Sequence, residues 1–258
     1  MANFHKYEWF IEQLTRHHEW AKKELAPNEI IAVLYTGSGN YACDDEDSDC
    51  DSWIIYFDKN YDPKTYQVNQ VQIGDEVTWT CDIRAFIYGC LHGNWAYLIA
   101  LFTKYAIINS RYTALWSGLY HYRDKIAYAN PEEGLDEMSR YMITYYTLLL
   151  DEACNKPHKK AYYIRLIDFL RSAYINGQDL STCFYNDDIG EQLREIKQSR
   201  WSLDEYIAYS KHYIDKLYNT QVDKYKMYRC TPANAQWVLQ LLSQFVKLGE
   251  EYDYTRED

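Results

Sequence analysis

An apolar strand that ends in a Gly-Ser turn and leads to a pair of acids constrains this chain more than any other feature. Residues 33–38 read Val-Leu-Tyr-Thr-Gly-Ser, and ten residues separate Ser38 from Asp49 in Asp49-Cys50-Asp51. Glycine allows close approach of the backbone, so amides around Gly37 and the Ser38 hydroxyl can donate to phosphate oxygens. A Gly-Ser turn alone is common, but together with the acid pair it indicates a site for phosphate and metal.

The acid pair lies where an acidic loop runs into an apolar strand. On an extended backbone residues i and i+2 point to the same side, so Asp49 and Asp51 are expected to face one space and Cys50 the core. Two carboxylates suit Mg²⁺, which completes its shell with water and substrate phosphates. The preceding acids, residues 44–47, we interpret as a solvated loop, because charge runs usually face water.

The composition is that of a globular protein and excludes several classes. The chain has 258 residues, 47% of them hydrophobic, and seven cysteines without paired spacing, which favours a reducing, cytoplasmic location. We expect no signal peptide, and no membrane span, because the apolar stretch 95–108 is short and contains Lys104. A net charge of −11 gives no general attraction to nucleic acids, so such a substrate would need a local basic patch.

Apolar runs rich in β-forming residues predict three strands in the first third of the chain, at 30–35, 52–57 and 77–83. Helical spacing predicts an opening helix that stops at Pro27. The connector 58–75 has room for an additional edge strand. Beyond it the pattern is helical and predicts no further strand, with helices at 84–91, 95–107 and 110–128.

The second half of the chain is predicted to be helical. Apolar spacing favours helices near 134–154, 158–175, 187–198, 202–219 and 232–248. Ser202-Leu203-Asp204-Glu205 has the form of a capping box. Strands followed by helices indicate an α+β protein: a small mixed β-sheet with flanking helices in residues 1–130, then a helical C-terminal domain in residues 131–258.

These motifs resemble those of the DNA polymerase β-like nucleotidyltransferase superfamily, and within it a bacterial and phage subfamily of predicted nucleotidyltransferases. The resemblance rests on Gly37-Ser38-Gly39-Asn40-Tyr41, on Ser48-Asp49-Cys50-Asp51, and on the later order of Asp82, a helix and Gly93-Asn94. It extends loosely from residue 33 to residue 217. Three positions depart from the subfamily pattern, Ala42, Trp95 and Ile99.

The resemblance implies metal-dependent nucleotidyl transfer, in which a nucleoside triphosphate gives its monophosphate to a hydroxyl and releases pyrophosphate. It implies two Mg²⁺ or Mn²⁺ ions held by Asp49, Asp51 and Asp82. The densest cationic segment supplies Lys160 and Arg165 as candidates for the triphosphate, beside Gly37 and Ser38. The nucleotide is undetermined, and the acceptor could be an RNA end, a protein or a small molecule.

Each of these assignments has an alternative that the sequence leaves open. Asp82 is equally suited to cap the helix that follows it. Lys160 and Arg165 also fit a solvated helix face. The departures favour a noncatalytic nucleotide-binding interaction factor, of a toxin–antitoxin or phage–host type, on the same fold. A metal-dependent phosphohydrolase would use similar carboxylates but does not need the Gly-Ser turn.

Overall fold

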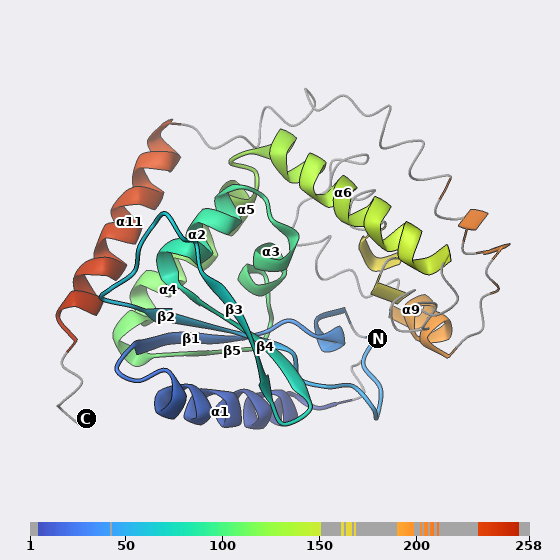
Figure 1. Ribbon diagram of the computed structural model, residues 1–258, viewed down its shortest axis with the longest axis horizontal. Helices are drawn as coiled ribbons and strands as arrows, with labels where there is room; N and C mark the ends of the chain where they lie inside the picture. Colours follow the sequence, from blue (N-terminus) through green and yellow to red (C-terminus); the bar gives the residue numbers. More distant parts are fainter. Residues whose placement is uncertain are drawn as a thin grey trace.

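A five-stranded mixed sheet forms the centre of the computed structural model, with helices on both of its faces (Figure 1). The structure describes residues 5–41, 43–150, 161–162, 164–166, 168, 190–198, 202, 204–205, 207–208, 211 and 232–252. The chain is therefore an α+β protein, as the order of its strands and helices predicts.

The strand order of the sheet is β3-β4-β2-β1-β5. The bounds are β1 (Glu29–Tyr35), β2 (Ser52–Phe57), β3 (Val68–Ile73), β4 (Glu76–Asp82) and β5 (Ala106–Ile108). Only β2 and β4 pair in parallel among these strands, and every other neighbouring pair is antiparallel. Because β2 and β4 run the same way, the residues that precede them lie at one edge of the sheet.

Strands β1 and β2 are buried on both faces, which explains why their sequences are continuous apolar runs. One face of the sheet packs Val33, Tyr35 and Ile54 against Phe10 and Leu14 of the first helix. The opposite face packs Leu34, Trp53, Ile55 and Phe57 against the later helices. Burial of these side chains is the main stabilising contribution to the fold, at about 25 cal/mol per Å² of apolar surface.

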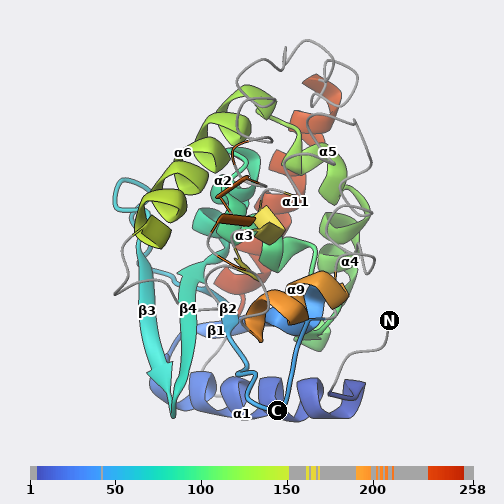
Figure 2. The ribbon, with the colours of Figure 1, turned by 90° about the vertical axis from the view of Figure 1, so that its right-hand side faces the viewer.

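The helices form two layers. Helix α1 (Tyr7–Glu24) alone among the described helices covers the first face, and the others gather on the second face or beyond it (Figures 1 and 2). Their bounds are α2 (Ile83–Leu91), α3 (Trp95–Leu101), α4 (Thr113–His121), α5 (Arg123–Ala127), α6 (Pro131–Leu150), α9 (Gly190–Lys197) and α11 (Pro232–Glu250). Short 3₁₀ turns, η1 (Ser38–Tyr41) and η2 (Ser110–Tyr112), follow β1 and β5.

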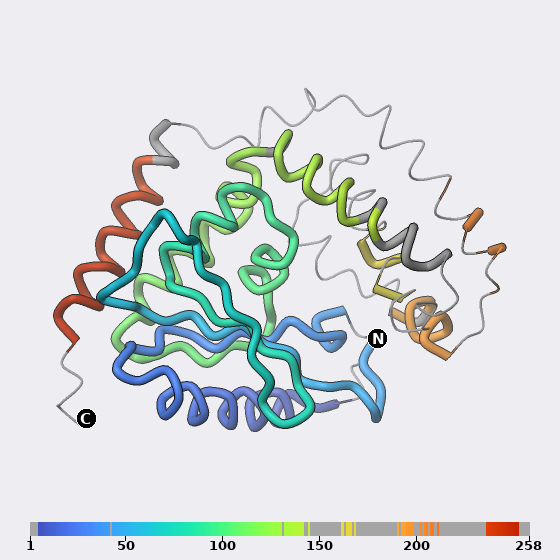
Figure 3. The backbone as a smooth tube through the Cα atoms, viewed as in Figure 1, coloured from blue at the N-terminus to red at the C-terminus, as the bar shows by residue number. Residues whose placement is uncertain are grey.

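Helix α11 returns from the end of the chain to the sheet half (Figure 3). Its Phe245 ring stacks on Tyr112 at 5.8 Å, and Arg111 donates a hydrogen bond to the Leu248 carbonyl oxygen at 3.0 Å. A Cβ atom at Gly249 would lie 2.2 Å from the Phe57 ring, so only glycine allows this approach. Residues 1–130 therefore share their core with a helix from the far end of the sequence.

The predicted strands at 30–35, 52–57 and 77–83 are confirmed within one residue at each end, and β3 is the additional edge strand in the connector. The helix predicted at 95–107 is wrong beyond residue 101, because residues 106–108 form β5. Pairing of Ile107 with Val33 on the neighbouring strand outweighs the local helical pattern. The helix predicted at 110–128 divides into η2, α4 and α5.

The later helices are confirmed where the structure describes them. Helices α6, α9 and α11 match the predictions near 134–154, 187–198 and 232–248, while most of 158–175 and 202–219 lies outside the described residues. The capping box is confirmed, since the Ser202 amide donates to Glu205 at 2.8 Å and the Glu205 amide donates to the Ser202 hydroxyl at 3.2 Å. Within the described ranges no helix combines the length and apolar character that a membrane span requires.

Candidate phosphate and metal site

The Gly-Ser turn is fixed to the acid pair and to the sheet by hydrogen bonds. The Thr36 amide, just after β1, donates to the Asp51 carbonyl oxygen at 2.9 Å. Buried Asn40 donates to the Tyr35 carbonyl oxygen at 3.0 Å and accepts from the Thr103 hydroxyl at 3.1 Å. The turn and the acids therefore lie side by side at one edge of the sheet.

Both glycines of the turn are required by close packing. A Cβ atom at Gly37 would lie 2.5 Å from the Tyr35 hydroxyl oxygen, and one at Gly39 would lie 2.4 Å from Cζ of Phe10. The Gly39 amide donates to the Tyr35 hydroxyl at 2.9 Å. The expectation that amides around the turn point at phosphate is therefore wrong for Gly39, whose amide serves to hold the turn in place.

Replacing Gly39 with alanine is expected to destabilise the protein by about 1–3 kcal/mol, because the added methyl group overlaps the buried Phe10 ring. Urea unfolding measures the change in free energy. Gly118→Ala in α4 is the matched control, since its Cβ would have ordinary contacts from 3.5 Å outward and would gain helix propensity. Equal stability of the two variants would contradict this account of the turn.

The acidic loop is only partly solvated. Glu46 and Asp47 are exposed, as predicted. Asp44 is buried, and its carboxylate accepts a hydrogen bond from the His5 amide at 2.8 Å, so its expected exposure is wrong. The amide of His5 compensates for the burial of one carboxylate oxygen only, because the other has no hydrogen-bond partner among the described residues. Ser48 connects the loop to the turn, because the Ser38 hydroxyl donates to the Ser48 hydroxyl at 3.1 Å.

The negative charge of Asp49 acts on the carboxyl group of Asp51, two residues further along the chain. Asp49 is exposed, Asp51 is half-buried and Cys50 is fully buried. Burial raises the pKa of Asp51 to about 7, and the negative charges of Asp49 and Glu76 add to the rise. A carboxyl group with this pKa is half-charged near neutrality and gains stability from a nearby cation.

Glu76 is the third acid of this edge, and the sequence analysis did not identify it. It begins β4, beside the end of the acidic loop, and accepts a hydrogen bond from the Cys50 amide at 3.3 Å. His17 of α1, whose pKa is lowered by burial, lies 2.8 Å from the Glu76 carboxylate, and Arg16 forms an ion pair with it. Glu76 is therefore held in place from α1.

Asp82 does not join the other acids. Asp82 ends β4 and pairs with Tyr56, whereas the amide of Val77, five residues earlier on the same strand, donates to the Asp51 carboxylate. Five residues of a strand span about 16 Å, which is therefore the separation of Asp82 from Asp51. Its buried carboxylate caps α2 by accepting from the Arg84 amide at 2.8 Å, and it also accepts from the Asp58 amide at 2.8 Å. The predicted metal role of Asp82 is wrong for this geometry, and the capping alternative describes it.

The structure describes Arg165 but not Lys160, the other predicted basic residue. Arg165 is 1% exposed, its guanidinium lies 4.5 Å from the centre of the Tyr41 ring, and it forms an ion pair with Asp168 at 3.5 Å. Arg165 is therefore buried against Tyr41 at the end of the turn. It lies neither on a solvated helix face nor in a position to contact a phosphate directly.

Lys197 contacts the acidic loop directly, and the sequence analysis did not identify it. Its ammonium group, at the end of α9, lies 2.8 Å from the Asp45 carboxylate and 3.2 Å from the Ser48 hydroxyl oxygen. Burial raises the pKa of Cys43 to about 11, and the positive charges of Lys197, Arg165 and Arg194 oppose the rise. Three cations from the helical half are thus close enough to act on Cys43, and Lys197 also contacts the loop.

The positions that depart from the subfamily pattern serve packing where the structure describes them. Trp95 is fully buried and donates from its indole to the Tyr162 hydroxyl at 2.7 Å, and Ile99 is 5% exposed. Ala42 lies outside the described residues. Trp95 and Ile99 are therefore part of the core and not of the polar edge.

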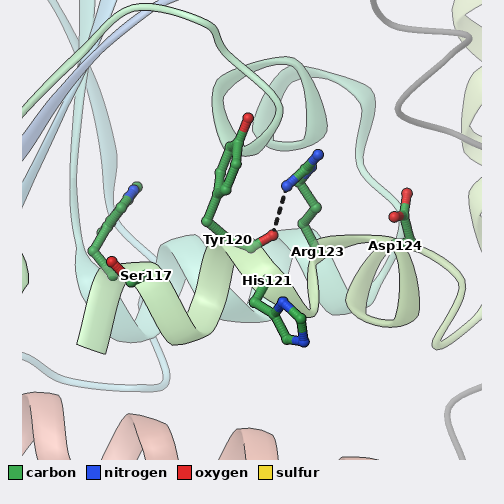
Figure 4. A pocket seen from close by; sticks show the side chains of 6 residues that line it. Ser117, Tyr120, His121, Arg123 and Asp124 are labelled. Atoms are coloured by element: carbon green, nitrogen blue, oxygen red, sulfur yellow. Dashed lines mark hydrogen bonds between the residues drawn. The ribbon is translucent and has the colours of Figure 1, made fainter. Parts of the chain in front are cut away.

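A separate hollow lies at the junction of α4 and α5 (Figure 4). Arg123 donates to the Tyr120 carbonyl oxygen at 2.8 Å, and its guanidinium covers the Tyr120 ring at 3.8 Å. The lining residues are Trp116, Ser117, Tyr120, His121, Arg123 and Asp124. None of these belongs to the turn, the acidic loop or β4, so this hollow is distinct from the phosphate and metal site.

Among the described residues, no three His, Cys, Asp or Glu side chains are already arranged to hold a metal ion. Asp49, Asp51 and Glu76 are neighbours, but they would have to reorient to share one. No protein-family model matches the chain, and no curated protein matches it either. Functional conclusions therefore rest on the chemistry of this edge.

Proposed function

We propose that this protein is a metal-dependent nucleotidyltransferase that moves a nucleoside monophosphate from a nucleoside triphosphate to a hydroxyl acceptor and releases pyrophosphate. The observation that carries the proposal is the half-buried Asp51, whose pKa is raised to about 7 by burial and by Asp49 and Glu76, directly beside the Gly-Ser turn. We further propose that it acts in the cytoplasm, consistent with the four buried free cysteines in the described residues.

The donor atoms of this edge fit Mg²⁺ or Mn²⁺. Asp49, Asp51 and Glu76 offer hard carboxylate oxygens, which these cations prefer, and the soft thiol of Cys50 beside them is buried. When bound, the metal would stabilise the charge on the phosphates and lower the pKa of the attacking hydroxyl. Asp49 and Asp51 would hold the metal, and the Ser38 hydroxyl, which donates to Ser48 in this structure, would donate to a phosphate oxygen instead.

A noncatalytic nucleotide-binding interaction factor is the second candidate. It is favoured by the engagement of Glu76 with His17 and Arg16, which leaves this carboxylate less free to bind a metal. It is also favoured by the position of Asp82 as a helix cap, since the expected third acid is then absent from the edge. The two candidates differ in turnover and not in binding.

Transfer of label from α-³²P nucleoside triphosphates tests the proposal. We expect the protein, with Mg²⁺ or Mn²⁺, to label an acceptor in cell extract from at least one of the four nucleotides. Asp49→Asn should reduce transfer about a hundredfold or more, because it weakens binding of the metal. Asp47→Asn, an exposed acid of the same loop, is the control and should retain transfer. Binding of nucleotides without any labelled product would favour the interaction factor.

A further inference from the structure

Lys197 and Ser48 together bind the carboxylate of Asp45, so an anionic side chain of the protein itself occupies these two donors. The Asp45 carboxylate accepts from Lys197 on one oxygen at 2.8 Å and from the Ser48 hydroxyl on the other at 2.7 Å. Burial acts to raise the pKa of Asp45, but the bonds from Lys197 and Ser48 outweigh it and hold the pKa below its usual value. The two donors therefore favour a charged, multidentate oxygen ligand.

This arrangement lies beside the candidate site. Ser48 also accepts from the hydroxyl of Ser38 in the Gly-Ser turn at 3.1 Å, and it directly precedes Asp49. Lys197 reaches the loop from α9 and also donates to the Cys43 carbonyl oxygen at 3.3 Å. Its side chain is 15% exposed and that of Asp45 is 39% exposed, so an incoming anion can reach the pair.

We infer that Lys197 and Ser48 bind the terminal phosphate of the triphosphate, and that Asp45 occupies this position until the substrate displaces it. The inference rests on the proposed function for the identity of the substrate. A terminal phosphate offers three oxygens where Asp45 offers two, so it can accept from Lys197, Ser48 and Ser38 together. Displaced Asp45 turns to water with its exposed neighbours Glu46 and Asp47.

An internal competitor makes substrate binding weaker than the donors alone would allow. A partly exposed ion pair contributes at most about 1 kcal/mol, so its removal should tighten anion binding about fivefold. Loss of the cation itself should weaken binding about tenfold or more, because Lys197 then no longer neutralises the phosphate. A structural ion pair without a ligand role would give neither change.

Titration calorimetry with inorganic tripolyphosphate and Mg²⁺ tests this, since the probe needs neither a base nor turnover. We expect Asp45→Asn to bind about fivefold tighter than the unaltered protein and Lys197→Met about tenfold weaker. Asp47→Asn removes the same charge from the same loop without touching Lys197, and should change binding less than about twofold. Thermal unfolding of each variant identifies any loss of fold.

The outcomes separate this inference from the proposed function. Equal binding by Asp45→Asn and Asp47→Asn, or unchanged binding by folded Lys197→Met, would overturn the inference while leaving transfer of label intact. The expected order of affinities without any nucleotidyl transfer would support the anion site and count against the catalytic proposal.

Discussion

Asp51→Asn is expected to reduce nucleotidyl transfer by about a thousandfold or more while making the metal-free protein more stable at pH 8. The loss of activity follows because asparagine keeps the shape but not the charge that would hold the metal. The gain in stability follows because the ionised Asp51 carboxylate is half-buried beside Asp49 and Glu76.

The sign of the pH dependence follows from the direction of the shift. Burial raises the pKa of Asp51 to about 7 in the folded protein, whereas an aspartate in the unfolded chain has a pKa of about 3.9. Folding therefore takes up a proton between these values. The protonated form contributes its stability fully below about pH 4, and this contribution is lost as the pH rises toward 7.

Thermal and urea unfolding in EDTA, at pH 5 and pH 8, measure the effect. We expect Asp51→Asn to exceed the unaltered protein by about 1–2 kcal/mol at pH 8 and to differ little at pH 5. Added Mg²⁺ should stabilise the unaltered protein more at pH 8 than at pH 5 and should leave the variant nearly unchanged. A variant that is less stable at pH 8, or that retains transfer, would refute the role of Asp51.

Asp82→Ala is expected to destabilise the protein by about 3–5 kcal/mol without a specific effect on transfer. The substitution removes the N-cap of α2 and leaves Arg84, which is 23% exposed, without its carboxylate partner. Asp82→Asn keeps the oxygen that accepts from the Arg84 amide. It places the side-chain amide NH₂ group, itself a donor, against two other donors, the Asp58 amide and the Arg84 guanidinium. It should therefore cost about half as much.

Urea unfolding gives the loss of stability, and transfer per folded molecule gives the activity at a temperature where both variants are folded. Asp47→Ala serves as the control, because its exposed side chain should contribute within about 0.5 kcal/mol. If Asp82→Asn abolished transfer and kept full stability, a metal role for Asp82 would have to be restored.

The strands nearest the site were predictable because their local patterns agree with their environment. β1 and β2 are continuous apolar runs and are buried on both faces, and the turn directly follows β1 while the acid pair directly precedes β2. β5 was not predictable in the same way. Ile107 and Ile108 fit a buried helix as well as a strand, and only pairing with β1 decides between them.

The third acid was misassigned because sequence does not give the register between strands. Asp82 stands before a helix and Glu76 after a turn, at opposite ends of one strand. Parallel pairing of β4 with β2 brings Glu76, and not Asp82, to Asp51. A signal for Glu76 was present in the turn at Gly74, which has a φ of 65° and marks where β4 begins.

The cation at the site was missed for a different reason. Lys197 lies in a helix whose position was predicted, but 152 positions separate it from Asp45 in the sequence. No local pattern distinguishes it from other lysines on a solvated helix face. Only tertiary packing brings α9 to the acidic loop, so this contact required coordinates.

The return of α11 to the sheet has a consequence for any attempt to divide this protein. A fragment that stops at residue 130 would expose the rings of Phe57 and Tyr112, which Gly249 and Phe245 otherwise cover. During synthesis the same surface stays exposed until α11 has left the ribosome. The core of residues 1–130 is therefore expected to be complete only after α11 has been synthesised.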